Sequence, residues 1–459
     1  MRLPFCSLII FCGLCVPLFA EKAEVARLAQ QLQDDDPAKS ADAAEALGKL
    51  GPAAIPALPQ LIKALEDERA TPRMVEHYIP GLNRYPLSVS QIAEAAIVEI
   101  GEPSVPFLVQ ELKRKRKPTR EQVIFLLRSI GKPAKAALPE LVAIVESRTR
   151  DELRVTAAYT YHTIADNNPL VLDQMIHWVN DSHMEIRYLA LARIGTYGTG
   201  GAAAVPAITK RLSDKANVRQ MISDHFGYET PLRQFACQAL GEIGAPSRDA
   251  VPQLHEMMRH DPEPVVRVAA ALAASRIDPS LEEGVQVLIE ELQRSRDAIS
   301  AIDQAAAALG ELGPRAERAW DLLVEMSKEK DWERSRWTAL RALQEIDGPR
   351  SLKLLMGALE NDPEILVRKV AAECLGELGA KAAPSVPALI HTLDLSSEEL
   401  FSDSLRAAAA KSLGQIGPLA RDALPSLEKL RDSEGSDGEK EAAAEAIRAI
   451  TTASFMDNP

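Results

Sequence analysis

A repeat of about 34 residues runs along almost the whole chain and constrains the fold more than any other feature. A clear copy lies at 367–393, where one apolar pattern ends at Gly379 and a second begins near Pro387. Apolar residues recur at three- and four-residue steps in both patterns, which predicts two amphipathic helices. Glycine takes the left-handed conformation that often ends a helix, and proline fits the first helical turn. Each repeat is therefore predicted to be a helical hairpin.

The position of Gly379 serves as a register mark for the other copies. Its equivalents recur at Gly51, Gly101, Gly131, Ala165, Gly198, Gly244, Asp278, Gly313, Asp347 and Gly417. Most copies carry an arginine at one fixed place in the first helix, namely Arg120, Arg154, Arg187, Arg233, Arg267, Arg336, Arg368 and Arg406. One hairpin cannot bury its apolar face alone, so successive hairpins must stack. The chain is predicted to be an all-α solenoid without β-strands.

The glycine turn, the proline that opens the second helix and the arginine of the first helix resemble HEAT repeats, above all the phycocyanobilin-lyase type of HEAT-like repeat. The resemblance covers residues 21–455 and implies a right-handed, armadillo-like superhelix of about eleven hairpins with capping helices. It also implies a ladder in which arginines reach an aspartate or turn carbonyl of the adjacent repeat, with Asp181, Asp261 and Asp362 as candidates. The alternative is a row of guanidinium groups that faces an anionic ligand.

The N-terminal residues 1–20 are predicted to be a secretory signal. Arg2 supplies the positive start, an apolar core follows at 5–19, and cleavage is expected near Ala20. The mature chain would then be exported, either periplasmic or secreted, with no transmembrane segment. The alternative is an uncleaved anchor. At the other end, residues 456–459 are expected to form a frayed tail.

Two insertions interrupt the repeats, at 67–89 and 213–231, and both are predicted to be loops. Aromatic residues are scarce in this chain, yet each insertion carries two of them beside a histidine: His77, Tyr78, Tyr85, His225, Phe226 and Tyr228. Aromatic side chains on loops often anchor a binding partner, so these residues are candidate partner-binding residues. The alternative is that the loops only cover apolar surface nearby.

The net charge of −13 argues against a nucleic-acid-binding role. A basic run at Lys113–Lys117 stands out in this acidic chain. Such a run could make weak contact with anionic lipid or polysaccharide of the cell envelope. The alternative is an ordinary solvated loop.

The sequence predicts no catalytic residue, no metal site and no cofactor. Its histidines are scattered, and Cys237 and Cys374 lie four repeats apart, too far to form a disulfide. Bilin lyases share the repeat, but an exported chain without their partners is not expected to be a chromophore lyase. The chain is predicted to be a non-catalytic scaffold that holds a protein or peptide on a concave surface of second helices and on the loops. The alternative is an enzyme or enzyme subunit, lyase- or hydroxylase-like, with a site at His77 or His225.

Overall fold

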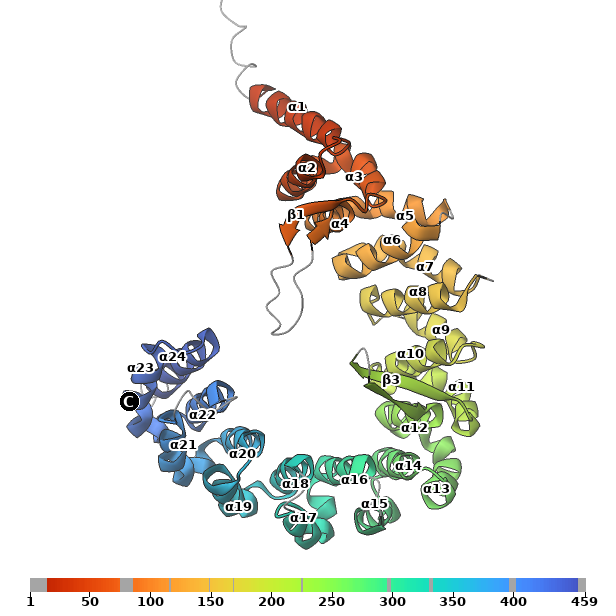
Figure 1. Ribbon diagram of the computed structural model, residues 1–459. Helices are drawn as coiled ribbons and strands as arrows, with labels where there is room; N and C mark the ends of the chain where they lie inside the picture. Colours follow the sequence, from red (N-terminus) through yellow and green to blue (C-terminus); the bar gives the residue numbers. More distant parts are fainter. Residues whose placement is uncertain are drawn as a thin grey trace, which may run out of the picture. The chain divides into compact units, whose positions relative to one another are not determined.

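The computed structural model describes residues 15–74, 86–114, 117–147, 149–167, 169–223, 226–294, 299–329, 333–395 and 402–452. Along these residues, helical hairpins stack on their neighbours (Figure 1). This arrangement confirms the predicted α-solenoid class. Contacts between elements divide the chain into two compact units, 1–193 and 194–459. None of the described helices is both long enough and apolar enough to cross a membrane.

In each hairpin, the helix before the register mark is the first helix and the helix after it is the second helix. Unit 1 contains α1 (Cys15–Gln31), α2 (Pro37–Lys49), η1 (Gly51–Ala57), α3 (Leu58–Ala64), β1 (Ala70–Met74), β2 (Pro86–Ser88), α4 (Val89–Ile100), η2 (Glu102–Ser104), α5 (Val105–Lys113), α6 (Lys117–Ile130), η3 (Lys132–Ala137), α7 (Leu138–Val145), α8 (Asp151–Ile164), α9 (Pro169–Trp178) and most of α10 (Met184–Gly195), whose last two residues belong to unit 2.

Unit 2 continues the alternation of first and second helices. It contains η4 (Gly198–Ala204), α11 (Val205–Thr209), η5 (Lys210–Ser213), β3 (Asn217–Ser223), β4 (Phe226–Pro231), α12 (Leu232–Ile243), η6 (Ala245–Ala250), α13 (Val251–His260), α14 (Pro264–Ile277), α15 (Glu283–Arg294), α16 (Ile299–Glu311), η7 (Gly313–Ala319), α17 (Trp320–Met326), α18 (Glu333–Ile346), α19 (Gly348–Asn361), α20 (Ile365–Glu377), η8 (Gly379–Ser385), α21 (Val386–Leu393), α22 (Ser402–Ile416), η9 (Gly417–Ala423), α23 (Leu424–Arg431) and α24 (Asp437–Thr452).

The turn inside a hairpin follows from the register glycine. Gly51 has a φ of 55° and Gly101 a φ of 72°, in the region that glycine enters without steric cost. A short 3-10 turn follows, and proline lies in the first turn of several second helices, including α3 and α21. Asp347 replaces the glycine with extended backbone, and its carboxylate caps α19 by accepting a hydrogen bond from the Arg350 N–H at 3.2 Å. The predicted hairpin turn is thus confirmed.

A second glycine, three residues before the register mark, lets neighbouring first helices approach closely. A Cβ added to Gly310 would lie 2.7 Å from the Cα of Ala342, and one added to Gly376 would lie 2.8 Å from the Cα of Ser412. Real Cβ atoms do not come so close to a neighbouring backbone, so only glycine allows this packing. The first helices of these repeats are therefore packed nearly backbone to backbone.

The same close packing explains the curvature within unit 2. First helices α14, α16 and α18 lie on the inner side of a curve, and second helices α13, α15 and α17 lie on its outer side (Figure 1). Because small residues shorten the stack on the side of the first helices, the stack bends toward that side. The prediction that second helices form the concave surface is therefore wrong for this unit.

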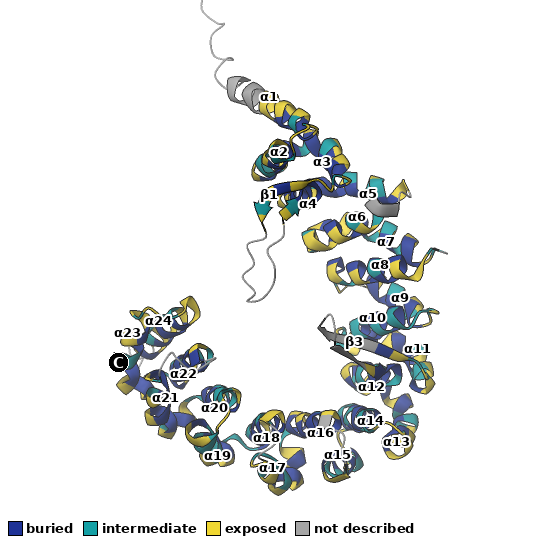
Figure 2. Cartoon of the chain, in the orientation of Figure 1, coloured by how far each residue is buried: buried dark blue, intermediate teal, exposed yellow. Residues whose placement is uncertain are grey.

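The core consists of small and branched apolar side chains. Buried residues recur in every helix layer along the stack (Figure 2). In unit 2, Leu309, Leu323, Leu343 and Leu355 have no exposed surface. Burying such a side chain contributes roughly 1.5–3 kcal/mol. Because adjacent hairpins supply both walls of this core, each repeat is stabilised by its neighbours.

The described parts of both insertions form antiparallel β-hairpins, so the predictions of loops and of a strand-free chain are wrong there. β1 pairs with β2, and β3 pairs with β4. Prolines in the first insertion suggested a loop, and Pro72 does lie in β1 while Pro86 begins β2. Both strands of a two-stranded sheet are edge strands, however, where proline is tolerated. Proline content therefore could not exclude a hairpin.

Side-chain contacts fix the first hairpin to the solenoid. The Thr71 hydroxyl donates to the Leu87 carbonyl at 2.8 Å and joins the two strands. The Arg73 guanidinium forms ion pairs with Asp42, at 2.5 Å, and with Glu45, both on α2. The hairpin thus lies against the first helix of the preceding repeat.

Candidate functional site

The repeated arginines link successive hairpins through aspartates of the following repeat. Arg233 contacts Asp261 through two hydrogen bonds of 2.7 and 2.8 Å, and Arg336 contacts Asp362 through two of 2.9 and 3.0 Å. Arg154 reaches Asp181 at 2.6 Å in the same way. Each of these aspartate carboxylates also accepts a hydrogen bond from the backbone N–H of the residue two positions later in the chain. These N–H groups belong to His183, Glu263 and Glu364. One carboxylate therefore fixes both the turn and the neighbouring repeat.

Two further arginines pair with buried glutamates. Arg267 contacts Glu291 through two hydrogen bonds of 2.8 Å, and Arg406 contacts Glu439 at 2.5 Å. Both glutamates are fully buried. The remaining positions are Arg187, which donates to the carbonyls of Asp181 and Ser182, and Arg120 and Arg368, which lie on α6 and α20. In these hydrogen bonds the arginines donate to groups of their own or the adjacent repeat, which favours the ladder over a row of guanidinium groups that faces a ligand.

The candidate partner-binding residues fall mostly outside the described part of the chain. His77, Tyr78, Tyr85 and His225 lie outside it. Phe226 and Tyr228 belong to β4, but their side chains are not described. In the basic run, Lys113 ends α5 with its Nζ atom 3.9 Å from Glu140, and Lys117 begins α6. The site of this chain must therefore be sought among other residues.

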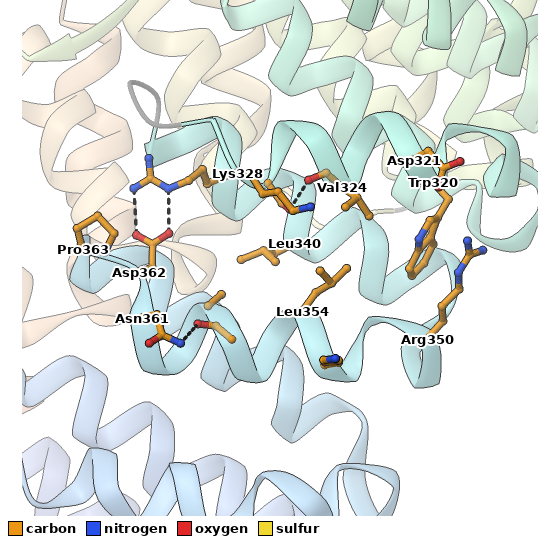
Figure 3. Close-up of a pocket in the computed structure, with 15 residues that line it drawn as sticks. Trp320, Asp321, Val324, Lys328, Leu340, Arg350, Leu354, Asn361, Asp362 and Pro363 are labelled. Atoms are coloured by element: carbon orange, nitrogen blue, oxygen red, sulfur yellow. Dashed lines mark hydrogen bonds and ion pairs between the residues drawn. The ribbon is translucent and has the colours of Figure 1, made fainter.

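A groove in unit 2 combines apolar and charged side chains in an open cavity of about 820 Å³ (Figure 3). Second helices α17 and α19 form its walls, and α18 forms its floor. Val324, Leu340 and Leu354 occupy the middle of the groove (Figure 3). Trp320 and Arg350 lie at one end and Asp362 at the other (Figure 3). A volume of this size falls in the range of small-molecule sites.

Trp320 and Arg350 are stacked at the end of the groove. The Arg350 guanidinium carbon lies 4.0 Å from the centroid of the Trp320 ring, within the range of a cation–π interaction. Glu317 also lies near this guanidinium, at 3.6 Å. Trp320 is only 6% exposed, so the pair offers the cavity mainly the planar, charged Arg350 side chain, which is exposed.

The charge of the groove differs from that of the chain. Lys328, Arg350 and Lys353 line it together with Asp321, while Arg336 and Asp362 neutralise each other. The lining therefore carries an excess of positive charge in a chain of net charge −13. Such a groove suits a molecule with an apolar body and anionic groups.

The sequence contains a signal for this groove that the repeat analysis did not use. Second helices at the equivalent position begin with a leucine or valine followed by proline, as at 58–59, 138–139, 251–252 and 386–387. The α17 helix begins with Trp320 and Asp321 instead. A departure from an otherwise regular repeat marks a position where packing alone did not select the residue.

The described thiols are poor candidates for nucleophiles. Cys237 and Cys374 are free and buried, which agrees with the prediction that they do not pair. Burial raises the pKa of the Cys374 thiol to about 12 and that of Cys237 further still. Only the thiolate reacts readily, so both residues are unreactive at neutral pH. Across the described ranges, no three His, Cys, Asp or Glu side chains gather in a way that could hold a metal ion.

Comparisons with known proteins agree on the repeat. The chain matches the HEAT repeats family over 228–303, 285–376 and 357–448. It matches the PBS lyase HEAT-like repeat family over 41–67. Among solved structures, a chain of the Kap95:Nup1 complex is 14% identical, with a TM-score of 0.57, and the match covers 95% of this chain and 64% of that chain. This likeness shows a shared fold.

A relative with a named activity is phycocyanobilin lyase subunit alpha from Nostoc sp. strain PCC 7120. It is 29% identical over 232 residues, which are 48% of this chain and 78% of the relative. A solved chain from the complex of CpcE and CpcF of phycocyanin lyase, from Nostoc sp. PCC7120, is 25% identical with a TM-score of 0.36, covering 62% of this chain and 97% of that chain. The prediction that the chain is not an enzyme is contradicted by the first relative, which is an enzyme subunit.

Proposed function

Since the chain is a HEAT-repeat protein, we propose that it is a subunit of a lyase-type enzyme that takes a bilin and works with a protein partner. The likeness to phycocyanobilin lyase subunit alpha, over 78% of that relative, is the observation that carries this proposal. Shared repeats alone would favour only a scaffold, because HEAT folds host many functions. A named lyase subunit at this identity favours an enzymatic role over a passive one.

The chain's contribution to such an enzyme is expected to be binding and positioning. The arginine ladder holds successive helices at fixed distances, so groups on neighbouring repeats keep their relative positions. Holding a reactant in place can itself supply a large part of a rate enhancement. The partner would complete the reaction site, as expected for one subunit of a larger enzyme.

An assay with the co-purified partner tests the proposal. The full chain is purified from its native cells under mild conditions, with whatever protein remains bound, and mixed with phycocyanobilin. We expect the visible absorption of the bilin to change on binding and mass spectrometry to detect bilin transferred to or released from a protein. The heat-denatured complex serves as the control. If the native complex handles phycocyanobilin no differently from this control, the lyase proposal is wrong.

We also propose, independently of the lyase role, that the chain is exported after cleavage near Ala20; both proposals hold together only if the bilin and the protein partner reach the same compartment. The basic start at Arg2 and the apolar core at 5–19 support this proposal. The intact mass of protein purified from native cells measures it directly. A mass that includes residues 1–20 would contradict cleavage.

A further inference from the structure

We propose that the groove between α17 and α19 binds a linear tetrapyrrole, with the flat body on the apolar middle and the propionate carboxylates at the lysines of the rim. This inference rests on the proposed lyase function and names the place where the substrate is held. A linear tetrapyrrole such as phycocyanobilin is a conjugated, largely apolar molecule with two propionates. The groove offers the complementary chemistry, which consists of Val324, Leu340 and Leu354 in the middle and cationic side chains at the rim (Figure 3).

The residue at the start of α17 departs from the repeat and fixes a planar cation, Arg350, at the end of the groove. Trp320 stands where the second helices α3, α7, α13 and α21 begin with leucine or valine. Its indole is held by the Arg350 guanidinium at 4.0 Å, so the stacked pair is already ordered before a ligand arrives. Because Trp320 is only 6% exposed, the group that can stack on a conjugated ligand is the planar Arg350 guanidinium, whose position the indole already fixes.

Gly357 is a second departure, on the opposite wall. It lies inside α19, where glycine is unfavourable relative to alanine. A Cβ added to Gly357 would meet no heavy atom within 4 Å, so close helix packing does not explain this glycine. The missing side chain leaves the groove wall open instead. Trp320 and Gly357 thus alter the two walls of the same cavity.

The charges at the rim favour an anion. Lys328 follows α17 and Lys353 lies on α19, and both side chains are exposed. Among the described residues, no carboxylate lies within ion-pairing distance of either lysine. Arg336 does not add to this charge because Asp362 neutralises it across 2.9 Å. Two lysines on facing walls match two carboxylates better than one charge would.

An equilibrium titration of the full chain with phycocyanobilin tests the site. Visible absorption and induced circular dichroism of the bilin report binding to an asymmetric site. We expect Trp320→Leu and Lys353→Glu each to raise the Kd about tenfold, because the first removes the ring that orders Arg350 and the second replaces an attraction with a repulsion. Trp320→Leu restores the residue that other repeats use, so the fold should persist. Lys381→Glu, an exposed lysine on η8 outside the groove, is the matched control and should change the Kd less than about twofold.

The outcomes separate the groove from the proposed function. If wild-type chain binds phycocyanobilin and both groove variants behave as the Lys381→Glu control does, the groove is not the site, while the lyase proposal stands on its own assay. If the groove variants weaken binding but the native complex shows no lyase activity, the groove is supported and the proposed function fails. Absence of bilin binding by the wild-type chain would overturn the inference. Binding of an acidic amphipathic peptide that Trp320→Leu weakens, without bilin binding, would overturn it in favour of a peptide groove.

Discussion

Replacing Arg267 by methionine should lower the free energy of unfolding by about 3–5 kcal/mol. The Arg267 guanidinium lies 2.8 Å from each oxygen of Glu291, whose side chain is only 1% exposed. Methionine keeps the apolar stem of the side chain but removes the charge, so the carboxylate would remain buried without its partner. The same arginine also donates to the Asp261 carbonyl at 2.8 Å, which adds to the loss.

The surface pair between Arg248 and Asp278 provides the matched control. Their atoms lie 3.2 Å apart, but the Arg248 side chain is 73% exposed. Arg248→Ala should therefore cost no more than about 1 kcal/mol. The double variant Arg267→Met/Glu291→Leu should recover most of the lost stability, because it replaces the buried pair with apolar groups.

Urea unfolding followed by circular dichroism gives the stability of each variant, and native-state hydrogen exchange locates the effect on α14 and α15. The second measurement is needed because a stack of repeats can open locally. The reasoning is wrong if Arg267→Met costs no more than Arg248→Ala. It is also wrong if Glu291→Leu, added to Arg267→Met, restores nothing.

The remaining predictions use glycine packing, one buried carboxylate and one buried thiol. Gly310→Ala should cost about 1–3 kcal/mol in urea unfolding, because its Cβ would lie 2.7 Å from the Cα of Ala342. Gly357→Ala, where no atom lies within 4 Å, should instead stabilise the chain by about 0.5–1 kcal/mol, and equal effects would refute the packing argument. Burial raises the pKa of Asp303, so its stabilising contribution is present below its unfolded pKa of about 3.9 and is lost as pH rises through the folded value. In Asp303→Asn, the urea midpoint should therefore fall less steeply as pH rises through the folded pKa of Asp303. A pH dependence identical to that of the wild type would contradict this prediction. Cys374, with its pKa raised to about 12, should react with a thiol reagent only after unfolding, and rapid labelling of this residue in the native protein would contradict its burial.

The repeat in the sequence was sufficient to predict the solenoid. A register glycine, a following proline and apolar residues at helical spacing act within one hairpin, and each is local in the chain. The resemblance to HEAT repeats also implied that arginines such as Arg233 would reach an aspartate of the adjacent repeat, and Arg233 does contact Asp261. Residues that recur once per repeat can be recognised in the sequence, because the same position in every repeat packs against the same neighbouring positions.

Tertiary structure decided the β-hairpins of the insertions, the direction in which unit 2 curves and the position of the groove. Strand pairing in the insertions depends on partners separated in sequence, such as Thr71 and Leu87, and prolines there were compatible with edge strands. The inner side of unit 2 depends on how closely first helices of different repeats approach, as at Gly310 and Ala342. The groove needs walls from two repeats at once. Local patterns determined the hairpins of helices, but distances between repeats decided which surfaces curve inward and where a cavity opens.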